Sequence, residues 1–161
     1  MMVQQTHPAA DSPAPGRLNL LLSRAGWQTN PWVDRLPTLL APLGVRSLVA
    51  DTACAAERVI RSTPVHIAVV DLALPLDSIP GADEESGVRV LELLARQPNH
   101  PPTVVIKRNR TARDNQREMN AALRAGAFAV VDRPHAQRDL ESLLQVLRRC
   151  LDRHYQSRWP Q

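Results

Sequence analysis

The chain has 161 residues, which suits one domain of ordinary size. Hydrophobic residues make up 43% and charged residues 22%, a balance that excludes a disordered chain, while the aromatic share of 3% predicts an aliphatic core. The formal net charge is +4, and Lys107 is the single lysine among 20 basic residues. No apolar run approaches the roughly 20 residues that span a bilayer, and no signal-peptide pattern is visible. We therefore expect a cytoplasmic protein without a membrane segment.

The composition changes near both ends of the chain. Residues 1–16 are polar and rich in proline and alanine, so we predict a flexible leader there. Residues 17–152 are predicted to form one domain, and 153–161 a C-terminal tail. Because no second domain fits in the remaining length, we expect a stand-alone domain.

The first half alternates apolar runs with helical patterns. The apolar runs predict strands at 18–22, 45–50 and 65–70, with a loop at 72–86. Helical spacing predicts a helix that starts at Asn30-Pro31 and reaches Leu43, and a second helix at 52–62. Pro37 is expected to kink the first of these helices, because it lacks a backbone donor.

The second half continues this alternation. Helices are predicted at 87–96, 114–125 and 137–151, and strands at 103–106 and 127–131. The strands are nearly continuous apolar runs, which is typical of a parallel sheet covered by helices on both faces. The predicted fold class is therefore α/β: a five-stranded parallel sheet, doubly wound, in three αβα layers. Sites in such sheets lie at the carboxyl ends of the strands.

Asp71 directly follows the most hydrophobic strand. A lone aspartate there is often only a polar strand end in contact with water. However, Asp71-Leu72-Ala73-Leu74-Pro75 resembles the phosphoacceptor segment of bacterial response-regulator receiver domains. Three further features resemble that family: Gly87 at the start of a helix, Ala125-Gly126-Ala127 before the fifth strand, and Arg133-Pro134 where the family has Lys-Pro, often with a cis bond. The resemblance implies a flavodoxin-like receiver fold over residues 17–152.

The chain departs from the family at most of the functional positions. The family's acidic pair, which holds Mg²⁺ with the acceptor aspartate, corresponds to Ser23 and Arg24, and no carboxylate lies between Asp11 and Asp34. The family has a Thr or Ser at the end of strand four, and this chain has Lys107 there. The family's lysine corresponds to Arg133, and its aromatic switch residue corresponds to Val130.

These departures predict a changed chemistry around Asp71. Arg24, Lys107 and Arg133 are expected to face it, and each opposite charge at 4 Å contributes about 4 kcal/mol before desolvation is subtracted. Such cations keep the carboxylate ionised and occupy the space of metal and phosphate. The pocket, which also includes Ser23 and Pro134, is thus predicted to bind no metal and no cofactor. We interpret the chain as a non-enzymatic pseudo-receiver in two-component phosphorelay signalling, acting through protein–protein contacts.

Two alternatives remain open at this stage. The chain can be an ordinary receiver that a histidine kinase phosphorylates on Asp71. It can also be a binding module for a phosphate-bearing, flavin-type cofactor, in which the 23–30 loop cradles the phosphate. That loop offers polar groups from Ser23, Gly26, Thr29 and Asn30, and Trp27 or Trp32 could stack on a flavin.

The charge pattern predicts the kind of partner that the protein binds. The family's contact face corresponds to residues 110–151, which are basic here, so we expect an acidic protein partner or a homodimer. Nucleic acid is not expected, because the basic clusters at 107–117 and 148–158 lack a recognition motif. The acids Asp77, Asp83, Glu84 and Glu85 are interpreted as a solvated loop rather than a substitute metal site.

Overall fold

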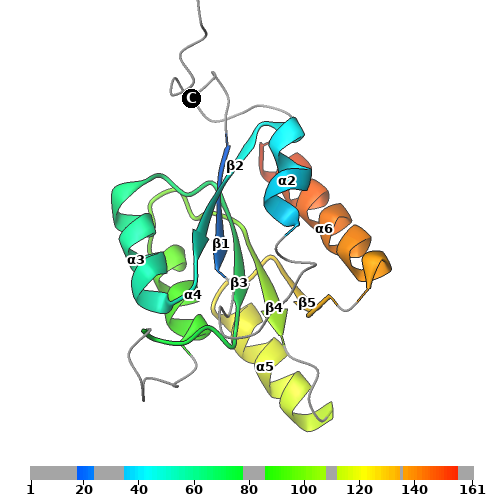
Figure 1. The fold of residues 1–161 in the computed structure, drawn as a ribbon. Coiled ribbons are helices and arrows are strands. Elements are labelled where there is room, and N and C mark those ends of the chain that lie inside the picture. The colour runs from blue at the N-terminus through cyan, green and yellow to red at the C-terminus, as the bar shows by residue number, and fades with distance from the viewer. Residues whose placement is uncertain (1–17, 24–34, 78–85, 108–111, 135, 156–161) are drawn as a thin grey trace, which may run out of the picture.

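Five parallel strands form one sheet in the order β2-β1-β3-β4-β5. The computed structural model describes residues 18–23, 35–77, 86–107, 112–134 and 136–155 (Figure 1). The strands are β1 (Leu18–Ser23), β2 (Val45–Ala50), β3 (Ile67–Asp71), β4 (Thr103–Lys107) and β5 (Ala129–Asp132). All five predicted strands are confirmed, and so is the doubly wound, flavodoxin-like fold class.

The helices follow the strands in alternation. They are α2 (Leu36–Leu40), the short 3₁₀ helix η1 (Ala41–Leu43), α3 (Ala53–Ser62), α4 (Gly87–Ala95), α5 (Ala112–Arg124) and α6 (Gln137–Tyr155). The start of α3 agrees with the helix predicted from residue 52. The Thr52 hydroxyl caps this helix, because it accepts a hydrogen bond from the Ala55 N–H at 3.0 Å. No helix in these described ranges is both long and apolar enough to cross a membrane.

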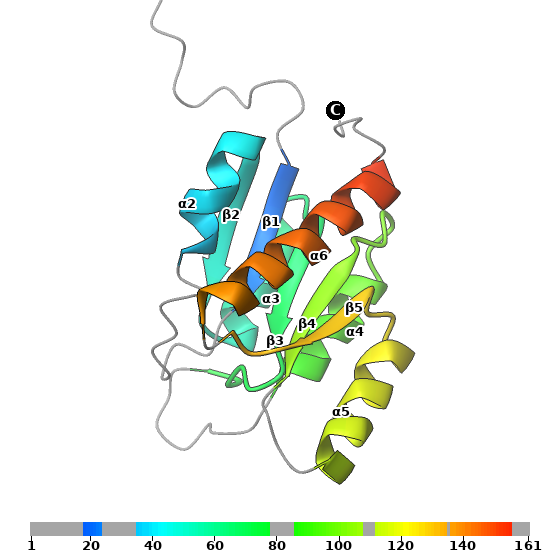
Figure 2. The same ribbon diagram turned by 90° about the vertical axis from the view of Figure 1, so that its right-hand side faces the viewer.

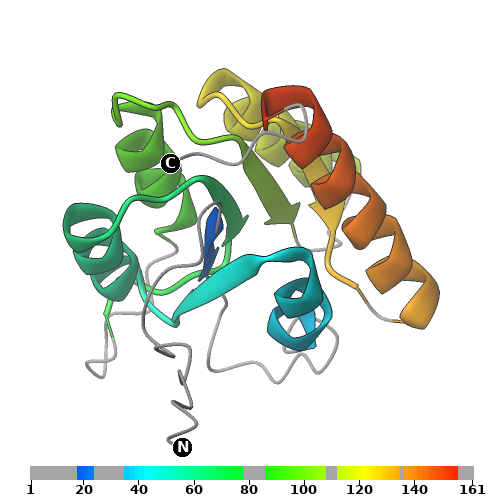
Figure 3. The same ribbon diagram turned by 90° about the horizontal axis from the view of Figure 1, so that it is seen from above.

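Helices cover both faces of the sheet. Figures 1 and 2 show α2 and α6 on one face, with α3 and α4 on the other. The same two layers enclose the sheet when it is seen from above (Figure 3). One aliphatic cluster joins β1 and β3 to α6 through residues such as Leu20, Val69 and Leu143, and the second joins the opposite face to α3 and α4 through residues such as Ile60 and Leu94. This burial on both faces explains why the strands read as continuous apolar runs.

The helix predicted before β2 is described only in its second part. Asn30 lies outside the described residues, and the described helix α2 begins at Leu36 with Pro37 in its first turn. A first-turn residue needs no backbone donor, so Pro37 fits the start of α2. The predicted kink involves residues 30–34, which lie outside the described residues, and it stays a prediction. The segment then ends at Gly44, whose φ of 80° is the left-handed conformation that glycine adopts without strain.

Helix α6 is longer than its prediction and is fastened at its end. It continues past Leu151 to Tyr155, whose hydroxyl donates to the His66 carbonyl before β3. The His66 ring in turn accepts the Asn19 N–H through Nδ1 at 2.9 Å. Burial lowers the pKa of His66, and burial together with the nearby Cys150 raises the pKa of Tyr155 to about 12. These contacts tie α6 to the amino-terminal edge of the sheet.

Candidate functional site

Asp71 is the last residue of β3 and is buried. Its Oδ1 accepts a hydrogen bond from the Ala73 N–H at 2.9 Å, and its backbone carbonyl accepts one from the Leu74 N–H at 3.1 Å. An aspartate side chain that bonds to the backbone two residues later stabilises a turn. The turn that leaves β3 therefore holds the carboxylate in a fixed orientation at the carboxyl edge of the sheet.

Gly87 packs directly against this turn. A Cβ atom added at Gly87 would lie 2.6 Å from the Asp71 carbonyl oxygen and 2.6 Å from the Leu72 Cα. Real Cβ atoms do not approach backbone atoms so closely, so α4 can sit against the end of β3 only because its first residue is glycine. The close contact between α4 and this turn thus explains why a glycine stands at position 87.

Arg133 forms an ion pair with Asp71. Its Nη2 donates to Asp71 Oδ2 at 2.7 Å, and the two side chains are 12% and 7% exposed. The backbone holds the arginine in place, because the Arg133 N–H donates to the Lys107 carbonyl at 3.0 Å, directly after β5. With Ala73 bonded to Oδ1, both carboxylate oxygens of Asp71 are engaged by the protein itself.

Lys107 does not pair with Asp71, contrary to the prediction. Its Nζ donates to Asp132 Oδ1 at 2.6 Å. The two residues are direct neighbours in the register of β4 and β5, which places both side chains at the same edge. Lys107 is 8% exposed and Asp132 is 63% exposed, so this ion pair reaches the surface.

Ser23 is completely buried at the end of β1. Its hydroxyl donates to the Val69 carbonyl of β3 at 3.1 Å. That hydroxyl proton is directed into the sheet and away from solvent, so the Ser23 hydroxyl does not offer it to a phosphate, as the flavin-type alternative would need. Arg24 and the remainder of the 23–30 loop lie outside the described residues, as do Trp27 and Trp32.

The two other predicted positions are Val130 in β5 and Pro134 directly after Arg133. Val130 in β5 is partly buried and packs against the cluster of α3 and α4. Pro134 is buried, and its peptide bond with Arg133 is trans, since no described bond is cis. The cis bond that the resemblance implied is therefore absent.

The described side chains around Asp71 do not fit Mg²⁺. This ion needs hard oxygen ligands, usually one or two carboxylates with water. Asp71 already binds a guanidinium, and Ser23 at the end of β1 donates its proton to a carbonyl. Within the described ranges no three or more His, Cys, Asp or Glu side chains are grouped so as to hold a metal. Asp83, Glu84 and Glu85 lie outside these ranges.

Comparison with known proteins identifies the fold. No protein-family model matches the chain, and no curated protein matches its sequence. A CheY-like response regulator receiver domain protein from Methanospirillum hungatei JF-1 superposes with a TM-score of 0.65 at 20% identity, covering 86% of this chain and 96% of its own. The chain has the fold of a response-regulator receiver domain.

Two further solved structures share this receiver fold. The signal receiver domain of an HD domain-containing protein from Pseudomonas fluorescens Pf-5 has a TM-score of 0.63 at 18% identity, covering 88% of this chain and 99% of its own. A response regulator from Burkholderia pseudomallei, solved with a phosphorylated aspartic acid, calcium ion and citrate, has a TM-score of 0.59 at 20% identity, covering 81% of this chain and 66% of its own. The likeness therefore spans most of the chain at low sequence identity.

Asp132 stands among the strand-end residues of the sequence, but its ion pair with Lys107 was not predicted. The signal that could have found it is the pairing of the last two strands: when neighbouring parallel strands end together, their final side chains meet at one edge. Lys107 ends β4 and Asp132 ends β5, so the lysine has a carboxylate beside it on the adjacent strand.

Proposed function

We propose that this protein is a pseudo-receiver that acts in two-component signalling through protein contacts, without Mg²⁺-dependent phosphorylation of Asp71. The observation that carries the proposal is the buried ion pair between Asp71 and Arg133 at 2.7 Å. In phosphoryl transfer to a carboxylate, the protein must leave an oxygen open for attack and supply positive charge to the phosphoryl group. Here the guanidinium occupies that oxygen from within the chain.

The ion pair also favours a single conformation of this edge of the sheet. It joins the end of β3 to the residue after β5, and both side chains are largely removed from water. Opening it would leave a buried charge without its partner, which is strongly unfavourable. A receiver switched by phosphate changes the contacts of its acceptor aspartate, whereas here the contacts are already satisfied.

The proposed contact surface lies on α5 and α6. Exposed arginines on these helices include Arg113, Arg117, Arg148 and Arg149. Their charge suits an acidic protein surface, and a histidine kinase is a candidate partner. We place the protein in the cytoplasm, where such partners act, and assign it no catalytic activity of its own.

Labelling with acetyl phosphate in the presence of Mg²⁺ tests the proposal. Intact-mass spectrometry is expected to show no phosphoryl adduct on the wild-type chain, while a receiver with a complete acidic pair is labelled under the same conditions. A stoichiometric, Mg²⁺-dependent adduct that disappears in Asp71→Asn would contradict the proposal and establish an ordinary receiver.

The second candidate is that ordinary receiver, phosphorylated by a histidine kinase. The observation in its favour is Asp71 itself, a carboxylate at the carboxyl end of the central strand β3. For phosphorylation, Arg133 would have to release Oδ2 of Asp71. The same labelling experiment decides between the two candidates.

A further inference from the structure

Strand β2 forms one edge of the sheet, and its outer side presents backbone groups. In its parallel pair with β1, the Leu18 N–H donates to the Gly44 carbonyl at 3.2 Å, and Leu18 lies beside Val45. Successive residues of a strand direct their backbone groups to alternate sides, so every second residue from Gly44 onward bonds to β1. The residues whose groups point outward are Val45, Ser47 and Val49. Within the described ranges, nothing forms a hydrogen bond with these outward groups.

The outward positions of β2 carry none of the features that block strand pairing. Natural edge strands avoid pairing with other chains through charged side chains, proline or bulges. None of the three outward residues is charged or proline. The register with β1 runs without interruption from Leu18–Val45 to Ser23–Ala50, so β2 has no bulge there. Val49 is 45% exposed, so an apolar side chain stands open at this edge.

Ser47, in the middle of β2, has an unsatisfied hydroxyl. Its Oγ is buried, and no described residue forms a hydrogen bond with it. A buried hydroxyl without a partner is unfavourable, so a partner that reaches it adds stability. Because Ser47 as a whole is partly exposed, rotation about its Cα–Cβ bond can turn the hydroxyl toward a strand added at the edge.

A second copy of β2 that runs antiparallel matches this edge. With a two-fold axis at Ser47, the two Ser47 residues lie opposite each other, and Val45 lies opposite the partner's Val49. Every outward residue then exchanges backbone hydrogen bonds with the partner, and the two Ser47 hydroxyls can bond to each other. In the same register Arg46 faces the partner's Leu48, so no like charges lie opposite each other.

The helical segment that packs against β2 is uncharged. Residues 36–44, which form α2, η1 and the glycine that follows, include no charged side chain, and Figure 2 shows α2 along this outer strand. Leu39 and Leu43 are 42% and 36% exposed. Two copies of a chain with a net charge of +4 repel each other, and they approach most readily through an uncharged apolar surface. The charge pattern therefore favours a second copy over an acidic partner at β2.

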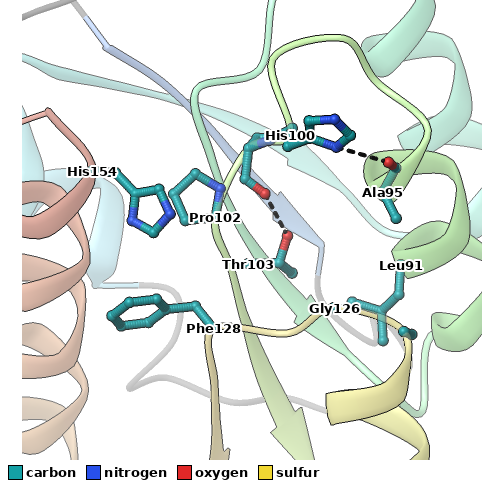
Figure 4. A pocket seen from close by; sticks show the side chains of 10 residues that line it. Leu91, Ala95, His100, Pro102, Thr103, Gly126, Phe128 and His154 are labelled. Carbon is teal, nitrogen blue, oxygen red and sulfur yellow. Dashed lines mark hydrogen bonds between the residues drawn. The ribbon is translucent and has the colours of Figure 1, made fainter.

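The other edge strand, β5, is less suited to pairing with a second copy. The groove beside its start is lined by Arg149, Asp152 and Arg153 of α6, an excess of positive charge that a second copy would meet. Phe128, directly before β5, packs edge to face on His154 of α6, with ring centroids 5.5 Å apart. Figure 4 shows this pair beside a cavity of about 310 Å³. Residues of α6 thus lie over the start of β5.

We propose that two copies of this chain associate through antiparallel pairing of their β2 strands about a two-fold axis at Ser47. The contact consists of one strand pair with its flanking apolar side chains, so the association is weak and reversible. It joins the two sheets into one continuous sheet. Asp71 takes no part in it, so the inference is independent of the proposed pseudo-receiver function.

Sedimentation velocity of the full chain over a range of concentrations tests the association. We expect a reversible equilibrium between monomer and dimer. Added salt should strengthen the association, because it screens the repulsion between two copies of charge +4. A chain that stays monomeric at its highest soluble concentration would overturn the proposal. So would a dimer that salt dissociates, because its contacts would be ion pairs.

Two variants connect the association to β2. Val49→Lys places a charge on the exposed edge and should weaken the association at least about tenfold. Val88→Lys on α4 is the matched control, since Val88 is 40% exposed, and it should leave the association unchanged. Ser47→Ala removes the shared hydroxyl and should weaken the association by about threefold to tenfold, without lowering the stability of the monomer. Equal effects of the two lysine variants, or unchanged association in Ser47→Ala, would overturn the assignment.

The register is tested by NMR on a mixture of ¹³C-labelled and unlabelled chains. In the Ser47-centred pairing, Arg46 and the partner's Leu48 form a non-hydrogen-bonded pair, whose Cα atoms lie about 4.5 Å apart. We therefore expect an intermolecular Overhauser contact between their Hα protons. Intermolecular contacts confined to α5 or α6 would show that the copies meet elsewhere and would overturn the proposal.

Discussion

Two ion pairs lie side by side at the carboxyl edge of the sheet, and they differ in burial. In the inner pair, Asp71–Arg133, both side chains are nearly enclosed, at 7% and 12% exposure. The outer pair, Lys107–Asp132, combines a buried lysine with a carboxylate that is 63% exposed. Water can replace one partner of the outer pair but neither partner of the inner one. The inner pair therefore fixes this edge, and the outer pair supports it.

Removing the guanidinium of the inner pair should have the largest effect. Arg133→Ala leaves the Asp71 charge buried without its partner, and we expect a loss of about 3–5 kcal/mol in the free energy of unfolding. Urea denaturation followed by circular dichroism measures this loss.

A double variant separates charge from packing in that result. Asp71→Asn with Arg133→Met removes both charges and keeps most of the volume, so it should be clearly more stable than Arg133→Ala. A double variant as unstable as the single one would mean that the ion pair is not the source of the effect.

The turn that presents Asp71 should be sensitive to a single methyl group. Gly87→Ala places a Cβ within 2.6 Å of backbone atoms of Asp71 and Leu72, so α4 or the turn must move. We expect a loss of about 1–3 kcal/mol, measured by the same denaturation. Val88→Ala, at an exposed neighbouring position, is the control and should cost much less.

The outer pair should contribute little. Asp132→Asn removes a carboxylate that is 63% exposed and keeps an amide oxygen that can still accept a hydrogen bond from the buried Lys107, so the expected loss is about 1 kcal/mol and smaller than that of Arg133→Ala. The loss should shrink further in high salt, which screens exposed charges. A loss as large as that of Arg133→Ala would remove the distinction between the two pairs.

The opposite edge of the sheet should respond weakly to pH. Burial lowers the pKa of His66 below its ordinary value of 6.5, so the unfolded chain takes up this proton more readily than the folded one. The contribution of His66 to stability is thus complete above pH 6.5 and is lost progressively as the pH falls below it. His66→Asn, whose amide oxygen can accept the Asn19 N–H, should flatten that part of the thermal-stability profile. An unchanged profile would show that other groups dominate.

Most of the fold could be predicted because its signals are local. Each strand is a continuous apolar run between polar or proline-rich segments, and the α6 stripe of leucines repeats at helical spacing. Local signals set the ends of elements less well. Pro37 has the same sequence appearance in a first turn as in a helix interior, and the end of α6 depends on a contact with His66 that lies 89 positions away.

The site was predictable only in part, since its partners depend on the third dimension. Asp71 and Arg133 stand at strand ends, so their proximity followed from the topology. Which cation bonds to Asp71 depends on the register of β4 and β5: that register sets Lys107 opposite Asp132 and leaves the following residue, Arg133, for Asp71. Three cations near one carboxylate could be named from the sequence, but their assignment required the structure.

A Mg²⁺ titration of the wild-type chain, followed by ¹H–¹⁵N NMR, tests the central claim most directly. If Arg133 stands where a metal would be needed, the amides of Asp71, Leu72 and Ala73 should show no saturable shift as Mg²⁺ is added. Saturable shifts confined to these three amides, absent in Asp71→Asn, would contradict the account and show that the carboxylate is open to metal.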